Sequence, residues 1–329
     1  MCSSIRKQRF LTLTMNPTVD ISTEVAKLEP QRKLRCGQPR LYPGGGGVNV
    51  ARMLHRLGEK VVALYPYGGF SGSRLRQMLK KEHIEQRPIP IRGETRESFM
   101  VTEAEQSDVY RFVLPGPTLS SSEAGQCLAV LQDELEASDF LVVSGSLPGG
   151  LDQAFYGRVA AIAKATQVPM LLDAPPPQIL DALVQGVALL RLNQTEFEEL
   201  AESPSLTARQ AQQQALRILD RYPIEALIVT LPQGAFLATR HTIYGVTAPR
   251  VHKRNPSGAG DCFVAGFVSR WLRNPSPNEA LSFGVACAAA AMGTEGGELA
   301  DLPAIEELTQ RVSRTKPVQA DELQAVTQV

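Results

Sequence analysis

The sequence predicts an α/β fold with three layers, in which helices cover both faces of a mostly parallel β-sheet and a small β-sheet lid lies beside it. Short apolar runs typical of strands alternate with stretches of helical spacing. Runs such as 140–144 are apolar at nearly every position, as expected of parallel strands buried on both faces. Two long stretches, 20–42 and 87–114, lack a helical pattern and carry extended-type residues, which predicts the lid.

The apolar runs define the elements in chain order. The expected core strands are residues 10–15, 61–65, 140–144, 170–173, 188–192 and 226–231. Segments with helical spacing are residues 48–57, 73–83, 152–165 and 208–221. Within the second lid stretch, strands are expected at 98–102 and 109–114, joined by a turn over 105–108.

These elements predict three parts of the chain. The α/β core comprises residues 1–19, 43–86 and 115–314. The β lid comprises residues 20–42 and 87–114, and residues 315–329 form a polar C-terminal tail with at most one helical turn.

Composition narrows the classes of function. The chain of 329 residues carries 34 Lys and Arg against 34 Asp and Glu, so a general nucleic-acid or acidic-membrane binder is disfavoured. The five cysteines are scattered without a Cys-x-x-Cys pair, as in a reducing compartment. The longest apolar run, 285–292, is too short to span a bilayer. We therefore expect a cytoplasmic protein with no nucleic-acid or membrane partner.

The strongest local signal is the segment Asn255-Pro256-Ser257-Gly258-Ala259-Gly260-Asp261, followed by apolar residues at helical spacing. Small residues at a helix N-terminus let successive backbone N–H groups face an anion, and the helix dipole adds positive potential. An acid beside such a site is suited to take a proton from an attacking hydroxyl. The alternative is that Asp261 only caps the helix.

A second signal is the glycine run in Pro43-Gly44-Gly45-Gly46-Gly47-Val48-Asn49, which opens a helical stretch. Four glycines allow close approach of the backbone to a ligand. The dinucleotide fingerprint and the Walker A pattern both fail here, which disfavours a nucleotide-dependent oxidoreductase. The alternative is a flexible loop without a ligand.

The third signal is Arg191-Leu192-Asn193-Gln194-Thr195-Glu196, a strand end followed by an acidic helix start. Such a strand end could contribute to a site. Asn and Glu three residues apart are equally typical of a helix N-cap with its capping-box partner.

Together, the motifs TLTMNPTVD, PGGGGVNVAR, VVSGSLPGG and NPSGAGD resemble the PfkB family of ribokinase-like sugar kinases, over about residues 11–311. Within it, the chain is most similar to the ATP-dependent 6-phosphofructokinase branch. That branch has glycine at the position of Gly46, where fructose-1-phosphate and tagatose-6-phosphate kinases usually carry lysine, and it has a lid lysine, here Lys33. MNPTVDIS and NPSGAGD read much like tagatose-6-phosphate kinases.

The resemblance implies a sugar-phosphate site between lid and core. Asp20, Gly45, Gly46 and Asn49 would hold sugar hydroxyls. Lys33, Arg96 and Arg111 would bind the phosphate already on the sugar, with Ser146 near it; each of the three cations could instead be a solvated lid charge. The lid would close over the sugar and pair with the lid of a second subunit in a homodimer.

The resemblance also implies direct phosphoryl transfer from ATP with Mg²⁺. Asp261 would deprotonate the C1 hydroxyl of a ketohexose phosphate, and backbone N–H groups of Gly258, Ala259, Gly260 and Asp261 would stabilise the transferring phosphoryl group. The implied nucleotide contacts are Arg191, Asn193, Glu196, Thr230 and Gly234. Asn193 and Glu196 would order the metal, Glu196 through water.

The chain departs from the family pattern in the part of the site that carries the implied nucleotide contacts. Arg191-Leu192 replaces the usual Lys-Pro, and Thr230-Leu231-Pro232-Gln233-Gly234 is one residue shorter than usual and lacks a glycine. The stretch 173–177 replaces a softer turn. The first hypothesis is phosphorylation of fructose 6-phosphate. Tagatose-6-phosphate kinase, fructose-1-phosphate kinase and a catalytically weak sugar-phosphate-binding homologue are the alternatives.

Overall fold

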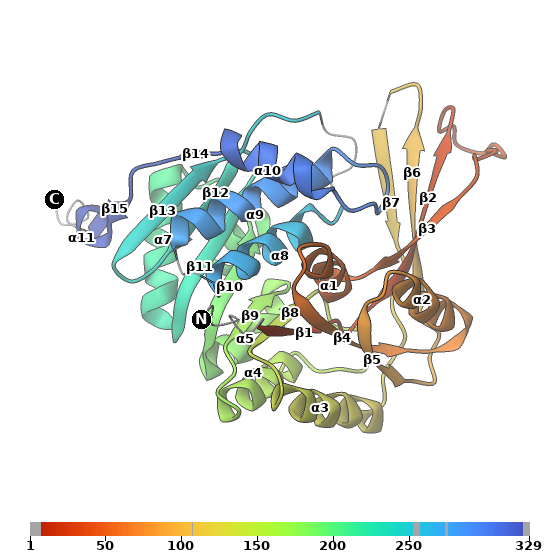
Figure 1. Ribbon diagram of the computed structural model, residues 1–329, viewed down its shortest axis with the longest axis horizontal. Helices are drawn as coiled ribbons and strands as arrows, with labels where there is room; N and C mark the ends of the chain where they lie inside the picture. The colour runs from red at the N-terminus through yellow and green to blue at the C-terminus, as the bar shows by residue number, and fades with distance from the viewer. Residues whose placement is uncertain (1–7, 107, 253–256, 274–275, 325–329) are drawn as a thin grey trace, which may run out of the picture.

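The computed structural model describes residues 8–106, 108–252, 257–273 and 276–324, which form two separate β-sheets (Figure 1). The main sheet has eleven strands. Its spatial order is β14 (Ser313–Arg314), β13 (Thr242–Thr247), β12 (Gly234–Ala238), β11 (Ile224–Leu231), β10 (Val187–Asn193), β9 (Met170–Asp173), β8 (Phe140–Ser144), β1 (Arg9–Leu13), β4 (Lys60–Tyr67) and β5 (Glu85–Pro90), with β15 (Val318–Gln319) on β13. The block from β11 to β5 is parallel, and β12 to β15 add antiparallel pairs.

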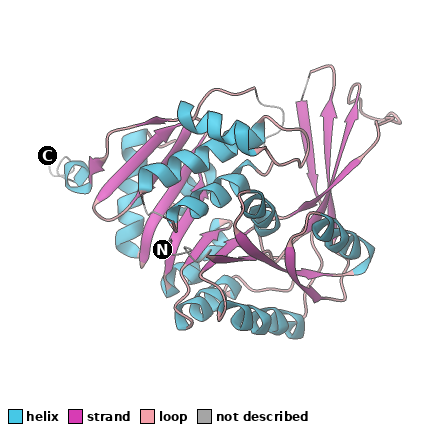
Figure 2. Ribbon diagram, in the orientation of Figure 1, coloured by secondary structure: helices cyan, strands magenta, loops and turns pink. Residues whose placement is uncertain are grey.

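Helices cover both faces of this sheet (Figure 2). One face packs against α1 (Gly46–Arg56), α2 (Gly69–Lys81), α8 (Ala259–Trp271), α9 (Pro277–Met292) and α10 (Leu302–Arg311). The other packs against α3 (Ser121–Leu135), α4 (Phe155–Ala165), α5 (Pro176–Gln185), α6 (Gln194–Leu200), α7 (Ala208–Arg221) and α11 (Ala320–Gln324). Successive residues of β4 show why: Val62 and Leu64 enter one core, whereas Val61 and Ala63 enter the other. The three-layer fold predicted from the apolar runs is confirmed.

The strand order places a crevice at the centre of the sheet. From β1 the chain proceeds outward through β4 and β5 on one side, and through β8, β9, β10 and β11 on the other. The order therefore reverses between β1 and β8. In open α/β sheets, ligands bind beyond the carboxyl ends of the strands at such a point.

The second sheet is the lid, with the order β3 (Arg40–Gly44), β2 (Thr18–Val25), β6 (Arg96–Glu103) and β7 (Asp108–Val113). It stands apart from the helical layers at one end of the molecule (Figure 1). Because side chains alternate between faces, the cross-strand partners Asp20, Ser98 and Val113 lie on the face toward the core. Ile21, Phe99 and Phe112 form a matching apolar row one residue further on.

The lid differs from the predicted boundaries at both insertions. Thr18, Val19, Pro43 and Gly44 already pair within the lid, because β2 and β3 continue beyond the predicted limits of 20 and 42. Residues 87–90, predicted as lid, belong to β5 and pair with β4 in the main sheet. Two prolines and an arginine in β5 hid its role as an edge strand, where unpaired backbone groups tolerate proline.

The C-terminal segment also differs from the predicted polar tail. β15 pairs with β13, and α11 packs on α7 with the side chains of Ala320 and Leu323 buried. The side-chain amide of Gln213 donates to the carbonyl of Leu323 at 3.0 Å. Two buried residues in a short polar segment give too weak a pattern to be recognised from the sequence.

No helix among the described residues combines the length and the apolar character needed to cross a membrane.

We predict that Leu323→Ala lowers the free energy of unfolding by about 2 kcal/mol or more, because it removes a buried side chain from the α7–α11 contact. Denaturant-induced unfolding followed by circular dichroism measures the change. Glu322→Ala, at the exposed neighbouring position, is the control and should leave the midpoint unchanged. Equal midpoints for all three proteins would mean that α11 does not contribute to the core.

Candidate active site

A pocket of about 400 Å³ lies between the carboxyl edge of the main sheet and the inner face of the lid. Many of the residues predicted from the sequence line it: Asp20, Gly45, Gly46, Asn49, Arg96, Arg111, Ser146, Arg191, Asn193, Glu196, Gly258, Gly260 and Asp261. They come from six separate regions of the chain. The topology of the fold therefore assembles what the motifs suggested singly.

The floor of the pocket is the N-terminus of α8. Gly258 is the N-cap residue in the left-handed conformation (φ 76°), and Ala259 begins the helix. Asp261 lies in the first turn, two residues into the helix, so the N-cap residue is Gly258 and not Asp261. Asn255 and Pro256 of the motif lie outside the described residues. The first N–H groups of a helix have no intrahelical acceptor, so this helix start is suited to an anion.

Asp261 is held by Asn49, whose side-chain amide donates to Oδ2 at 2.9 Å. Burial, followed by the negative charge of Asp173, raises the pKa of Asp261 to about 7. The hydrogen bond from Asn49 and the charge of Arg191 act in the opposite direction. A carboxyl group that titrates near neutral pH is matched to general base catalysis.

The glycine run is a fixed part of the site and not a flexible loop. Gly45 has φ 104°, and its carbonyl accepts the first backbone hydrogen bond of α1, from Asn49 N at 2.9 Å. Gly46 lies directly against Ser144 at the end of β8, where a side chain would collide with both backbone and hydroxyl atoms. The run therefore brings the start of α1 against the switch point of the sheet.

The lid provides an acid and two arginines above this floor. Burial raises the pKa of Asp20, although Arg111 and Arg96 oppose the shift. Arg96 donates to the carbonyls of Leu114 (3.2 Å) and Asn16 (3.1 Å), and burial lowers its pKa. Arg111 faces the pocket from the adjacent strand. Two cations near one acid leave this half of the pocket with a net positive charge, as an anionic substrate requires.

Two predicted phosphate contacts have different surroundings. Ser146 lies in the pocket, and its hydroxyl is 3.4 Å from the side-chain amide of Asn16. Lys33 lies in the exposed segment between β2 and β3 and does not line the pocket of its own chain. No apolar pattern in that segment indicates where its side chains lie.

The opposite half of the pocket centres on Arg191. Its Nη1 pairs with Asp173 Oδ1 at 2.9 Å, and its Nη2 donates to the hydroxyl of Thr230 at 2.6 Å. Burial alone would lower the pKa of Arg191, but the charge of Asp173 and the hydrogen bond to it raise the pKa. Asp173 also accepts from Ser144 Oγ at 3.1 Å. Arg191 is thus fixed between β9 and β11, and its planar group lies against Gly260.

Asn193 and Glu196 form the capping box of α6, the alternative that the sequence left open. Asn193 Oδ1 accepts from the Glu196 backbone N–H at 3.0 Å, and Glu196 Oε2 accepts from the Asn193 backbone N–H at 2.9 Å. Burial raises the pKa of Glu196. Both residues still line the pocket, so capping fixes their position at its edge.

The strand β11 ends in a tight hairpin. Leu231 and Gly234 pair across the two residues Pro232 and Gln233, and Gly234 begins β12. Thr230 reaches the site through its bond to Arg191, whereas Gly234 is buried in the sheet and does not line the pocket. The missing residue of this loop therefore shortens it to a two-residue turn, and Pro232 supplies no N–H donor there.

The carboxylates of the pocket suit a divalent cation that binds together with the phosphates of a nucleotide. Among the described residues, no cluster of three or more acidic, His or Cys side chains could hold a metal by itself. Both carboxylate oxygens of Asp173 are engaged, whereas only one oxygen of Glu196 takes part in the capping box. Mg²⁺ is commonly bound by one or two carboxylates together with substrate phosphates and water, which these residues fit.

Two residues of the site were missed from the sequence. Asp173 and Ser144 end adjacent parallel strands and bond to each other. The available signal was a polar residue at the end of an apolar run, which places a side chain at the carboxyl edge of a parallel sheet.

The fold and the pocket define a class: an enzyme that transfers a phosphoryl group to a hydroxyl of a polar substrate held under a lid. The model of the pfkB family of carbohydrate kinases matches residues 13–305. The chain is 41% identical over 291 residues to the ATP-dependent 6-phosphofructokinase isozyme 2 of Mycobacterium tuberculosis, with 88% of this chain and 86% of that protein covered. It is 31% identical over 293 residues to the isozyme 2 of Escherichia coli, with 88% and 94% covered.

A solved structure agrees with these relatives. The crystal structure of phosphofructokinase-2 from Escherichia coli in complex with potassium superposes with a TM-score of 0.87 at 30% identity, covering 92% of this chain and 99% of that one. The chain belongs to the pfkB family of carbohydrate kinases, and it is a phosphotransferase with a ribokinase-like fold.

We predict that Asp261→Asn raises the stability of the free protein more at pH 8 than at pH 5. The folded-state pKa of Asp261, about 7, lies above its unfolded value of 3.8, so the folded protein binds the extra proton between these values. Stability from this group is present at low pH and is lost as the pH rises through about 7, by on the order of a few kcal/mol.

The measurement is the thermal midpoint of both proteins at pH 5 and pH 8 in the absence of ligands. Asparagine can still accept the hydrogen bond from Asn49. The difference between the midpoints should be larger at pH 8 than at pH 5. A constant difference at both pH values would contradict the raised pKa.

Proposed function

We propose that this chain catalyses the ATP-dependent phosphorylation of a ketohexose phosphate at its C1 hydroxyl, with fructose 6-phosphate as substrate and fructose 1,6-bisphosphate as product. The observation that carries the proposal is a single pocket in which Asp261 lies between two arginines of the lid and the Asp173–Arg191 pair. The two relatives named as 6-phosphofructokinases support the choice of substrate.

The sugar half accounts for binding. Asp20 accepts hydrogen bonds from hydroxyls of the sugar, and Asn49, Gly45 and Gly46 border the same space. Arg96 and Arg111, with Ser146 opposite, bind the phosphate that the sugar already carries. Gly46 has no room for a side chain beside Ser144, which disfavours the lysine typical of fructose-1-phosphate and tagatose-6-phosphate kinases at this position.

The chemical step follows from the floor of the pocket. Asp261 as carboxylate takes the proton of the C1 hydroxyl, whose oxygen attacks the γ-phosphorus of ATP. Backbone N–H groups at the start of α8, from Gly258 to Asp261, stabilise the negative charge on the transferring phosphoryl group. Asn49 orients the acceptor oxygen of Asp261 through its hydrogen bond.

The part of the pocket around Arg191, which we call the nucleotide half, holds ATP through side chains that are already fixed by hydrogen bonds. Arg191 offers its remaining N–H groups to the phosphates while Asp173 and Thr230 hold it in place. Glu196, through its free oxygen and water, and Asn193 order Mg²⁺, which offsets negative charge on the ATP phosphates when bound. Thr230 reaches the nucleotide only through Arg191, and Gly234 acts only by shaping the turn.

The experiment is an ADP-release assay with Mg-ATP against fructose 6-phosphate, tagatose 6-phosphate and fructose 1-phosphate. We expect kcat/KM for fructose 6-phosphate to exceed the others by about tenfold or more. Asp261→Asn should lower kcat by at least about a thousandfold, because base and charge are lost together. Asp133→Asn, at an exposed position on α3, is the control.

The outcomes separate the alternatives. A preference for another of the three sugars would retain the mechanism and reject the substrate. Phosphosugar binding without ADP release would favour a binding protein, in which the two-residue turn at Pro232 no longer supports turnover.

We also propose that the chain is a homodimer joined through its lids. Phe99, Tyr110 and Phe112 leave 37%, 39% and 50% of their surface exposed, and β7 is an edge strand. An exposed apolar sheet face with an open edge favours pairing with another copy.

We predict that Phe112→Glu converts a dimer into a monomer, because a charge is placed on the apolar row of the lid. Size-exclusion chromatography with light scattering measures the mass. Val184→Glu, at a 64% exposed position on α5 far from the lid in the sequence, should keep the mass of the parent protein. A parent protein that is already monomeric would reject the proposal.

A further inference from the structure

Arg52 of α1 lies beneath the glycine run and joins three elements. It is 5% exposed. Its Nη1 donates to the carbonyls of Pro43 at 3.2 Å and Gly297 at 3.3 Å. Its Nε and Nη2 donate to the two carboxylate oxygens of Glu82, at 2.7 and 2.8 Å. One guanidinium thus links the end of lid strand β3, the turn after α9 and the end of α2.

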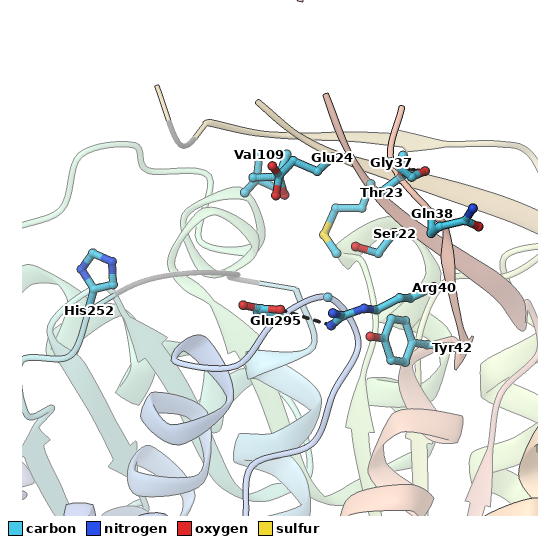
Figure 3. Close-up of a pocket in the computed structure, with 13 residues that line it drawn as sticks. Ser22, Thr23, Glu24, Gly37, Gln38, Arg40, Tyr42, Val109, His252 and Glu295 are labelled. Atoms are coloured by element: carbon cyan, nitrogen blue, oxygen red, sulfur yellow. Dashed lines mark hydrogen bonds and ion pairs between the residues drawn. The ribbon is translucent and has the colours of Figure 1, made fainter. Parts of the chain in front are cut away.

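The two carbonyls that Arg52 binds belong to one contact between lid and core, which we call the β3 joint. It consists of Arg40, Tyr42 and Pro43 from the lid and residues 295–298 from the core. The ring of Tyr42 lies against Gly296 and Gly297, where any side chain would collide with it. Figure 3 shows Tyr42 beside Arg40, which extends toward Glu295.

Surface charges of the joint contribute little to holding it. Arg40 pairs with Glu295 at 3.1 Å and Glu298 at 3.3 Å, and more than half of each side chain is exposed. Exposed pairs of this kind contribute at most about 1 kcal/mol. These pairs border a polar cavity of about 540 Å³ that opens between the lid and residues His252 and Glu295 (Figure 3). The buried contacts of Arg52 are therefore the strong part of the joint.

The joint reaches the sugar half of the pocket through the backbone. Pro43 pairs with Val19, and the next residue, Gly44, lies directly against the carboxylate of Asp20. Gly45 and Gly46 then enter the pocket. A small space beside Asp20 is also lined by Gly296 and Gly297. A shift of Pro43 relative to Gly297 would therefore move Asp20 and the glycine run together.

The positive charge of Arg52 has little electrostatic effect on the pocket, because a neighbouring carboxylate neutralises it. Glu82 compensates its charge with two parallel hydrogen bonds. What the guanidinium supplies in addition is geometry: its Nε and Nη2 fork fixes it to Glu82 while Nη1 bridges the two carbonyls, and a lysine ammonium with three N–H groups could not make all four bonds.

We propose that Arg52 is a positioning residue for the sugar substrate: it fixes β3 to the Gly296–Gly297 turn and so holds Asp20 and the glycine run in the geometry that binds the phosphosugar. This inference rests on the proposed function. It assigns no contact between Arg52 and the substrate.

The test uses two variants that differ in charge. Arg52→Lys keeps the charge for Glu82 and loses the fork. The double variant Arg52→Gln/Glu82→Gln removes both charges, so that no buried carboxylate is left unpaired. Arg56→Gln is the matched control: one turn later on α1, Arg56 donates to the carbonyls of Leu299 and Ala300 in the same loop, and among the described residues it makes no hydrogen bond to the lid.

The readouts are kcat, KM for each substrate, the affinity for fructose 6-phosphate without ATP by calorimetry, and the thermal midpoint. For both Arg52 variants we expect KM and Kd for fructose 6-phosphate to rise about tenfold or more, with KM for ATP within about twofold of the parent. Glu82→Gln alone and Arg56→Gln should leave both constants near those of the parent.

Three results would overturn the inference. Arg52 variants that match Arg56→Gln would show that the fork does not position the sugar site. Equal losses for both substrates, in parallel with the thermal midpoint, would show a role in stability only. A parent protein that neither binds fructose 6-phosphate nor releases ADP would reject the proposed function together with this inference, and that result appears before any variant is made.

Discussion

The constraint on which the site depends is the crowding of acids at the carboxyl edge of the sheet. Asp173, Glu196 and Asp261 line one pocket with Arg191. Arg191 pairs directly with Asp173, and none of the residues that the structure describes forms an ion pair with Asp261. Burial and the charge of Asp173 then move the pKa of Asp261 toward neutrality. The bonds of Arg191 to Asp173 and Thr230 also join the ends of β9, β10 and β11.

In the half of the pocket next to the lid, glycine residues let backbone segments pack directly against neighbouring residues. Gly46 against Ser144 and Gly44 against Asp20 allow α1, β8 and the lid to meet without intervening side chains. Such contacts tolerate little displacement, because a shift of a few tenths of an ångström produces collisions. The lid is therefore not a free flap: its strand β3 is fixed to the core, whereas β7 lies at the free edge of the lid sheet.

Sequence patterns predicted the fold and three candidate motifs of the site from local signals, whereas the lid contacts such as Asp20 and Arg96 came from the family resemblance. Apolar runs identify buried strands, and a glycine-rich turn before an apolar helix identifies an anion site, as at Gly258. Asp173 was missed because an acid at a strand end has no distinctive local pattern. Lys33 could not be placed because its segment has no periodicity, and the tail was misjudged because two buried residues, Ala320 and Leu323, do not make a pattern.

The nucleotide half is where the sequence departs from its family, and the structure gives those departures a common physical form. Arg191 replaces a flexible ammonium with a planar group held by Asp173 and Thr230, and the turn at Pro232–Gln233 has lost a residue. The held arginine and the shortened turn both have less conformational freedom than the flexible side chain and longer loop that they replace. A rigid nucleotide half needs less ordering when ATP binds but can adjust less to its phosphates. In the proposed reaction, placing the ATP phosphates would then depend more on the N-terminus of α8, which the Asn49–Asp261 bond ties to α1.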